Sequence, residues 1–271
     1  MIPQAFEYDR PESVAEAVEL LRTHGDGAKV LAGGHSLVPM MKLRLAAFDH
    51  LVDISGIPGL RGVRDAGDHI AIGATTTHRE VAESALIAAE CPVLSQAAGM
   101  VGDMQVRSRG TIGGSIAHAD PHGDLPAVLL ALGGEVQCEG PGGTRTIAAD
   151  DLFVDYLTTA VSADQLVTEV RVPKAHRGAY VKFNRRRQDW AIVGVAAVIS
   201  DGAARIALTG VGPTPIRARA AEAAWNGSNP ADAAALAAEG LEPAADLAGS
   251  AEYRRHLARV LTRRALEAAS A

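Results

Sequence analysis

The sequence predicts an α+β protein with two small α/β lobes, followed by a C-terminal domain of three antiparallel strands and a helical bundle. The chain has 271 residues, and this length favours two domains at about 150 residues each. Residues 6–31 show strand, helix and strand patterns in turn, whereas the chain after Pro173 shows three strand patterns and then only helical ones. Strands followed by helices are typical of α+β domains. The expected domains are 1–175 and 176–271, with lobes of the first at 1–55 and 56–175.

Helix-start signals and a glycine define the first lobe. Ser13 and Glu16 have the spacing of a capping box, and Gly25 ends the helix that they begin. This helix joins two strands into a β-α-β unit that ends directly before Gly33. The expected elements are a strand at 6–8, a helix at 13–25, a strand at 28–31, a short helix or irregular turn at 37–45, and a strand at 50–54.

The second lobe shows the same kinds of signal. Thr77 and Glu80 form another capping-box pattern. Asp124 is expected at or near the N-cap of an apolar helix, with Pro126 in its first turn. Pro141-Gly142-Gly143 is typical of a hairpin turn. The expected elements are strands at 69–72, 135–138, 145–147 and 165–172, and helices at 77–83, 85–90, 93–101 and 124–132.

The C-terminal domain is predicted from one strong turn and a long amphipathic helix. Asp201-Gly202 lies between two apolar runs, which is a strong hairpin signal. In the last helix, Leu257, Leu261 and Ala265 lie on one face. The expected elements are strands at 180–184, 191–200 and 205–210, and helices at 218–225, 231–239 and 253–268.

Composition excludes several classes of protein. The formal net charge of −6 argues against a nucleic-acid partner, and no apolar run approaches the ~18 residues of a transmembrane segment. The first residues lack the pattern of a signal peptide, so we expect a cytoplasmic protein, with membrane association through a complex left open. Cys91 and Cys138 are too few to ligate an iron–sulfur cluster and are expected as small buried hydrophobes. The nine histidines show no recognised metal spacing, so no metal site is expected.

Two glycine-serine motifs are the main functional signal. Gly33-Gly34-His35-Ser36 and Gly113-Gly114-Ser115 each follow a β-like run, at 29–31 and 111–112. Glycine permits positive φ and lets a ligand approach the backbone, and such turns form anion-binding concavities. Two of these loops could hold one diphosphate from two sides, and a long dinucleotide such as FAD can use two phosphate loops. The alternative is a pair of ordinary tight turns; neither a G-x-G-x-x-G nor a P-loop motif is present.

The two motifs lie in longer segments that resemble one family. Residues 32–44 read A-G-G-H-S-L-V-P-M-M-K-L-R, and residues 105–126 contain R-G-T-I-G-G-S-I-A-H-A-D-P. Both resemble the FAD-binding subunit of molybdenum hydroxylases, the medium subunit of the carbon monoxide dehydrogenase type. Ser108 stands where asparagine is usual in that family and Met104 where proline is common, and neither change affects a glycine. The resemblance extends from Phe6 to about Ala271.

The resemblance implies a fold, a cofactor and partners. It implies a vanillyl-alcohol-oxidase-type (PCMH-like) domain that holds FAD between its two lobes. It also implies an iron–sulfur small subunit with two [2Fe–2S] clusters and a molybdopterin large subunit, assembled as a dimer of heterotrimers. Electrons would pass from molybdenum through the clusters and FAD to an external acceptor. The substrate would bind another chain, so carbon monoxide, an aldehyde, a purine and other N-heterocycles remain open, as does the acceptor.

The expected site residues bind the cofactor and none is catalytic, because the flavin itself carries the redox chemistry. The resemblance implies that Lys29 lies along the cofactor, that His118 contacts its flavin side and that Asp124 binds the adenosine ribose. The two motifs contribute the remaining residues: Val30, Leu31, Ala32, Gly33, Gly34, His35, Ser36, Leu37, Thr111, Ile112, Gly113, Gly114 and Ser115.

Two further expected site residues come from the C-terminal domain. The resemblance places Lys182 near the pyrimidine edge of the flavin, where a cation would stabilise negative charge. It places Trp190 against one face of the isoalloxazine, where an indole could stack. The alternatives are a solvated strand lysine for Lys182, an ordinary core tryptophan for Trp190, and an exposed or capped histidine for His118.

The sequence leaves two alternative functions open. A stand-alone FAD oxidase or reductase of the vanillyl-alcohol-oxidase type would need its own substrate domain, and the chain after Pro173 is short for one. A non-redox nucleotide-binding module would lack flavin absorption, so the colour of the purified protein separates it from both flavoprotein hypotheses.

Overall fold

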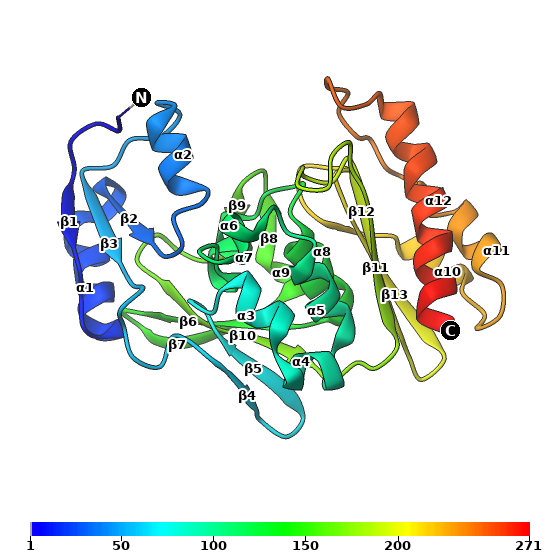
Figure 1. Ribbon diagram of the computed structural model, residues 1–271, viewed down its shortest axis with the longest axis horizontal. Coiled ribbons are helices and arrows are strands. Elements are labelled where there is room, and N and C mark those ends of the chain that lie inside the picture. The colour runs from blue at the N-terminus through cyan, green and yellow to red at the C-terminus, as the bar shows by residue number, and fades with distance from the viewer. Residues whose placement is uncertain (1) are drawn as a thin grey trace.

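The first lobe is a three-stranded parallel sheet with a helix on one face. The computed structural model describes residues 2–271. The strand order is β1-β3-β2, and the lobe forms one end of the molecule (Figure 1). Its elements are β1 (Glu7–Asp9), α1 (Val14–His24), a 3₁₀ turn (Gly25–Gly27), β2 (Ala28–Leu31), α2 (Leu37–Lys42) and β3 (His50–Asp53).

The start of α1 corrects one detail of the sequence prediction. The Ser13 hydroxyl accepts a hydrogen bond from the Glu16 N–H, as a capping box requires. The Glu16 carboxylate, however, accepts from the N–H of Glu12 at 2.8 Å instead of that of Ser13. The second capping box is complete, because Thr77 and Glu80 make both reciprocal bonds.

The second lobe is a five-stranded antiparallel sheet with helices over one side (Figure 1). The strand order is β4-β5-β10-β6-β7, and a two-stranded ribbon of β8 and β9 lies beside it. The strands are β4 (Val63–Asp65), β5 (His69–Gly73), β6 (Glu135–Gly140), β7 (Gly143–Ala148), β8 (Phe153–Asp155), β9 (Thr158–Thr159) and β10 (Leu166–Pro173). The helices are α3 (His78–Glu83), α4 (Ala85–Glu90), α5 (Pro92–Gly99), α6 (Met104–Arg107), α7 (Ile112–His118), α8 (Asp124–Leu132) and α9 (Ala149–Leu152).

The C-terminal domain has a four-stranded antiparallel sheet, one strand more than predicted. The order is β11-β12-β13-β14, and the added strand pairs Ile216 with Leu208 and Arg217 with Ala207. Two residues that follow Pro215 carry no alternating pattern, so this strand depends on its neighbour and not on local sequence. The elements are β11 (Gly178–Phe183), β12 (Val193–Ser200), β13 (Ala203–Thr209), β14 (Ile216–Arg217), α10 (Arg219–Ala224), α11 (Pro230–Ala235) and α12 (Ala251–Ser270).

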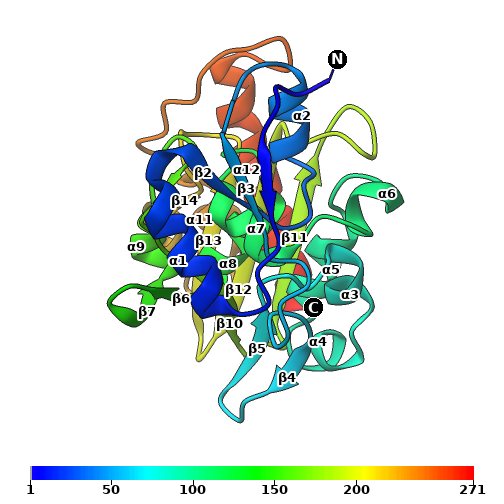
Figure 2. The ribbon, with the colours of Figure 1, turned by 90° about the vertical axis from the view of Figure 1, so that its left-hand side faces the viewer.

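The C-terminal sheet is covered on both faces. Helix α12 packs against β11 and β12 on one face, and α8 packs against β12 and β13 on the other. Figure 2, a quarter turn from Figure 1, also shows α12 behind the sheet. Consequently Val193 to Ile199 are buried without a break, as expected for a strand enclosed between two layers. Tyr180 and Val198 belong to the core of the second lobe, whereas Ala17 and Val52 form a separate core in the first lobe.

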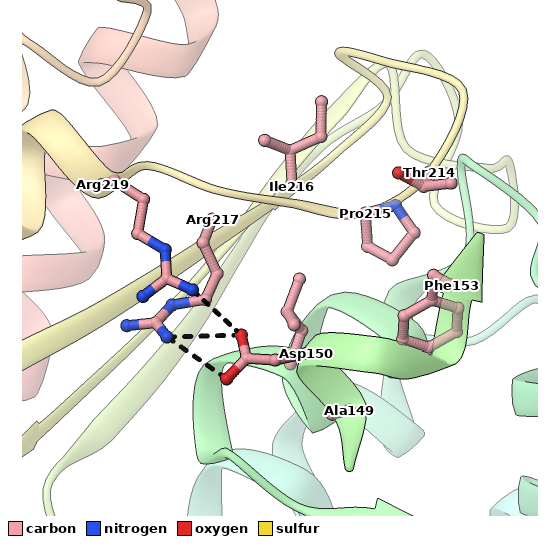
Figure 3. Close-up of a pocket in the computed structure, with 9 residues that line it drawn as sticks. Ala149, Asp150, Phe153, Thr214, Pro215, Ile216, Arg217 and Arg219 are labelled. Atoms are coloured by element: carbon pink, nitrogen blue, oxygen red, sulfur yellow. Dashed lines mark hydrogen bonds and ion pairs between the residues drawn. The ribbon is translucent and has the colours of Figure 1, made fainter. Parts of the chain in front are cut away.

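Charged side chains reinforce the contact between the second lobe and the C-terminal domain. The Asp150 carboxylate of α9 is within 3.3 Å of guanidinium nitrogens of Arg205, Arg217 and Arg219. Asp150, Arg217 and Arg219 line a cavity of about 280 Å³, and Figure 3 shows these three side chains with their ion pairs. Arg217 also pairs with Glu222 at 2.7 Å. These ion pairs therefore connect the second lobe to the C-terminal domain.

Two expectations from composition concern cysteines and membrane spans. Cys91 and Cys138 are free thiols with no exposed surface, and burial raises their pKa values to about 12 and about 11. The prediction of small buried hydrophobes is confirmed. Among the helices described over residues 2–271, none combines the length and apolar character needed to span a bilayer.

Candidate cofactor-binding cleft

A cleft of about 720 Å³ lies where the first lobe, the second lobe and the C-terminal domain meet. This volume is within the usual range of small-molecule sites. Both glycine-serine motifs line it, together with the loop that contains Trp190. Of the residues expected at the cofactor, all line the cleft except Leu31 and Ile112. Ile112 is 1% exposed and packs in the core of the second lobe.

The first motif turns sharply away from the end of β2. Gly34 has φ of 75°, a conformation that favours glycine. Gly33 is needed for a different reason, because a Cβ at this position would collide with the backbone carbonyl of Arg109. The prediction of positive φ is therefore right for Gly34, whereas Gly33 permits close approach of the segment that leads into the second motif.

The second motif corrects the sequence analysis, because it is not a loop after a strand. Thr111 is the N-cap of α7, and its hydroxyl accepts the N–H of Gly114 at 3.1 Å. Neither Gly113 nor Gly114 is among the glycines with positive φ. The β-branched pair at 111–112 has strand propensity, but Thr111 makes only an isolated bridge with Thr77. A threonine three residues before Gly114 was the available signal for a helix start.

The two glycines of the second motif have different surroundings. A Cβ on Gly113 would lie 2.5 Å from the Cβ of Ala74, so this residue permits packing of α7 on the second lobe. A Cβ on Gly114 would meet only the hydroxyl of Thr111, at 2.7 Å, and Gly114 is exposed. Gly114 is therefore the glycine of this pair that presents an open backbone to the cleft.

Lys29 and His118 line the cleft from the first and second lobes. The Lys29 ammonium lies 5.8 Å from the centre of the Phe48 ring, a cation–π distance. His118 is the last residue of α7 and is half-buried. Burial lowers its pKa, with the charge of Asp120 acting in the opposite direction, so the imidazole is neutral at pH 7 and can donate or accept.

Asp124, Tyr180 and Lys182 form a buried group on the wall of the cleft. Asp124 is the first residue of α8, directly after the N-cap Gly123, which agrees with the expected position at or near the cap. The Tyr180 hydroxyl donates to Asp124 Oδ1 at 2.6 Å, and the Lys182 ammonium donates to Oδ2 at 3.0 Å. Burial raises the pKa of Asp124, while Lys182 and Tyr180 lower it. Burial and the Asp124 charge raise the Tyr180 pKa far above its ordinary value.

This contact limits the roles expected for Asp124 and Lys182. The resemblance assigned Asp124 to the adenosine ribose and Lys182 to the pyrimidine edge of the flavin. These two parts of an extended FAD are separated by the ribityl chain and the diphosphate, whereas the two side chains are 3.0 Å apart. The pair can therefore serve only one end of an extended cofactor.

The exposure of Trp190 excludes its alternative interpretation as a core residue. Trp190 is 70% exposed and lines the cleft, whereas Trp225 is 9% exposed and packs in the C-terminal core. An exposed indole at the edge of a cleft can provide a stacking surface for a planar ligand.

His78, the first residue of α3, is a cleft residue that the sequence does not predict. This imidazole lines the cleft, is 4% exposed, and has no hydrogen-bond partner for its Nδ1. Burial lowers its pKa to about 4, so it is neutral at pH 7. A histidine directly after an N-cap threonine carries no functional signal in a single sequence; only the packing of α3 places it here.

The cleft has the features that a dinucleotide needs. Gly34 and Gly114 present backbone without side chains, and Ser36 and Ser115 add hydroxyl groups. Lys29 and Lys182 supply positive charge, and His78 supplies an unpaired buried nitrogen. Trp190 supplies an aromatic surface. The lining therefore fits FAD, with its anionic diphosphate and its planar flavin.

Comparison with known families agrees with this geometry. The FAD-binding domain in molybdopterin dehydrogenase matches residues 4–175, and the CO dehydrogenase flavoprotein C-terminal domain matches residues 178–269. The chain belongs to this flavoprotein family. As a member, it binds FAD and is an oxidoreductase component.

Relatives of this flavoprotein match it along almost their whole length. The medium chain of carbon monoxide dehydrogenase from Hydrogenophaga pseudoflava is 44% identical, covering 99% of this chain and 98% of the relative. The nicotine 6-hydroxylase medium subunit of Paenarthrobacter nicotinovorans is 39% identical, with 98% of each chain covered.

Solved structures confirm the predicted fold class of the flavoprotein. A carbon monoxide dehydrogenase structure from H. pseudoflava superposes with a TM-score of 0.95 at 46% identity, covering 99% of this chain and 98% of the other. Quinoline 2-oxidoreductase from Pseudomonas putida 86 gives 0.93 at 32% identity, with the same coverage.

Proposed function

We propose that this flavoprotein passes electrons from the iron–sulfur clusters of a partner subunit, through FAD, to an external acceptor. The partners would be an iron–sulfur small subunit and a molybdopterin large subunit, in a cytoplasmic dimer of heterotrimers. The supporting observation is the near-complete mutual coverage with medium chains of carbon monoxide dehydrogenase and nicotine 6-hydroxylase. A subunit that matches such chains from end to end fits the role of one component among several.

The chain's own residues support a relay function. A cluster needs about four thiolates, and the sequence contains only two cysteines, so clusters would have to come from a partner. The large cleft matches the needs of FAD itself, which leaves substrate oxidation to another chain. Residues 185–187 are three exposed arginines directly before Gln188, which lines the cleft, and an acidic partner surface could dock on them.

Each part of the cleft has a distinct task in this proposal. When bound, FAD supplies reversible two-electron redox chemistry. Gly34 and Gly114 would let their backbone approach the diphosphate. The Lys182 ammonium would stabilise negative charge at the pyrimidine edge, and Asp124 holds that ammonium in position. We place the Asp124–Lys182 pair at the flavin end, because Trp190 follows β11, the strand that carries Lys182.

The decisive experiment separates a relay subunit from a stand-alone oxidase. The purified chain is loaded with FAD and mixed anaerobically with carbon monoxide, aldehydes or N-heterocycles while flavin absorbance is followed. We expect no bleaching until the two partner subunits are added. Dithionite, which should bleach the isolated chain, is the control for a redox-competent flavin. Rapid bleaching of the isolated chain by any of these substrates would support the oxidase alternative and contradict the relay.

A further inference from the structure

A second cluster of polar side chains lies outside the cofactor cleft. Asp9 ends β1, His24 ends α1 and His50 begins β3, and none of the three lines the cleft. Their ligand-type atoms, one from each residue, all lie within 4.8 Å of one another. We propose that these three residues form a site for a divalent transition-metal ion, with zinc as the reference ligand.

Topology explains why residues so far apart in sequence meet. Strands β1 and β3 are parallel neighbours, with Glu7 opposite His50 and Asp9 opposite Val52. Side chains alternate between the two faces of a strand, so Asp9 and His50 point to the same face. Helix α1 covers that face, because Leu21 packs with Val52 in the first-lobe core. The helix stops at His24, where Gly25 adopts φ of 51°, so His24 lies over His50.

The distances are close to those of a metal site. Zinc bonds to nitrogen and oxygen ligands of about 2.0–2.1 Å place two tetrahedral ligand atoms about 3.3 Å apart. His50 Nδ1 and Asp9 Oδ2 are 3.2 Å apart. The His24 and His50 rings are stacked, with centroids 3.6 Å apart and planes at 21°. Because imidazole lone pairs lie in the ring plane, binding one ion requires one of these two partly exposed rings to rotate.

The chemistry of the three groups favours a transition metal. Two imidazoles and one carboxylate suit zinc, copper or nickel, whereas magnesium and calcium prefer oxygen ligands alone. The side chains of His50 and Asp9 are 24% and 30% exposed, so an ion can enter and water can complete the coordination. Glu7, the register partner of His50, adds negative charge on the same face. The ion would connect α1, β1 and β3, three elements of the first lobe (Figure 1).

The experiment uses the full-length, FAD-loaded chain without an affinity tag, freed of metal by a chelator. Titration calorimetry with zinc should show one site per chain. Asp9→Asn, His24→Gln and His50→Ala should each weaken that site about tenfold or more, since each removes one of three protein ligands. His69→Ala is the matched control, because His69 pairs with Asp68 at 2.6 Å but belongs to no three-residue cluster among the described residues. It should leave zinc affinity unchanged.

A spectroscopic measurement identifies the ligands independently. Copper(II) bound to the unaltered chain should show electron paramagnetic resonance couplings from two imidazole nitrogens, and His24→Gln should reduce them to one. Unchanged flavin content in each variant shows that the protein is folded, and the two conservative variants keep the test valid if His50→Ala does not fold. No zinc binding at millimolar free metal would overturn the proposal. Zinc affinity in all three variants equal to that of the unaltered chain would overturn it as well. The stacked pair would then be only a packing contact.

Discussion

The Lys182 ammonium donates a hydrogen bond to Asp124 Oδ2 at 3.0 Å, with side-chain exposures of 2% and 6%. This contact joins the first turn of α8 in the second lobe to β11 of the C-terminal domain. The C-terminal domain therefore contributes a charged group to a cleft whose glycine motifs belong to the first two lobes. Attraction between opposite charges is stronger here than at the surface, because little water screens it.

We expect Lys182→Met to lower the free energy of unfolding by about 3–5 kcal/mol at pH 7, because it leaves a buried carboxylate without its partner. Removing the ammonium also removes an influence that lowers the pKa of Asp124. A carboxyl group whose pKa is higher in the folded than in the unfolded chain stabilises the fold while it is protonated. That contribution to the free energy of unfolding is lost as pH rises through the folded pKa. The loss in the variant should therefore be smaller at pH 5 than at pH 7, as measured by urea unfolding.

The double variant Asp124→Asn, Lys182→Met is the control for this pair. Because both charges are absent, it should be closer to the unaltered chain in unfolding free energy than Lys182→Met alone. If the double variant loses as much unfolding free energy as Asp124→Asn and Lys182→Met lose together, the pair is not energetically coupled.

Gly114→Val should abolish FAD retention, because the new side chain enters the cleft from an exposed backbone position. The valine also displaces the Thr111 hydroxyl that caps α7, at a cost of about 1 kcal/mol, so the protein should remain folded. Flavin absorbance after gel filtration measures retention. Gly142→Val, at a hairpin position with open space around it, should keep its FAD. Full occupancy in Gly114→Val would show that this glycine does not contact the cofactor.

Trp190→Ala should brighten flavin fluorescence, because a stacked indole quenches an excited flavin. The indole is 70% exposed and lines the cleft, so its removal leaves the core intact. Trp225→Phe is the control, since Trp225 lies in the C-terminal core. An equal quantum yield in both FAD-loaded variants would argue against stacking by Trp190.

His78→Gln should make the protein less sensitive to acid. The pKa of His78 is lowered by burial to about 4, whereas an unfolded histidine titrates near 6.5. Between these values the unfolded chain binds a proton that the folded chain does not, so stability falls as pH falls. At pH 4.5 this linkage costs about 2–3 kcal/mol relative to pH 7.

Urea unfolding of the FAD-free protein at both pH values measures the effect of His78. His176→Gln, a change at a side chain that is 66% exposed, should retain the full acid dependence. The same acid loss in His78→Gln as in the unaltered chain would show that another group is responsible.

Much of the fold could be predicted where the signal is local. Asp201 and Gly202 have φ of 51° and 81°, and they close the predicted hairpin between β12 and β13. Thr77 and Glu80 form the predicted capping box. The sequence does not predict strand β14, because its two residues have no pattern of their own. It predicts a strand and a loop where α7 begins, because Thr111 and Ile112 have strand propensity.

The cleft likewise contains features that the sequence predicts and features that it does not. The two motifs predicted a dinucleotide ligand, the family that they resemble indicated FAD, and both motifs line the cleft. They did not distinguish Gly33, which permits contact with Arg109, from Gly114, which is open to the cleft. They also gave no sign of His78, or of the Tyr180 hydroxyl that donates to Asp124.

The sequence by itself determined the family, the cofactor and most helices and strands, because caps, turns and glycine motifs act through atoms a few residues apart. Only the tertiary structure decided which distant side chains meet. The Asp124–Lys182 pair depends on packing of the C-terminal sheet against α8, and the Asp9, His24 and His50 cluster depends on α1 lying over two parallel strands. Such contacts arise from the way layers bury their apolar faces, and residue spacing along the chain does not encode them.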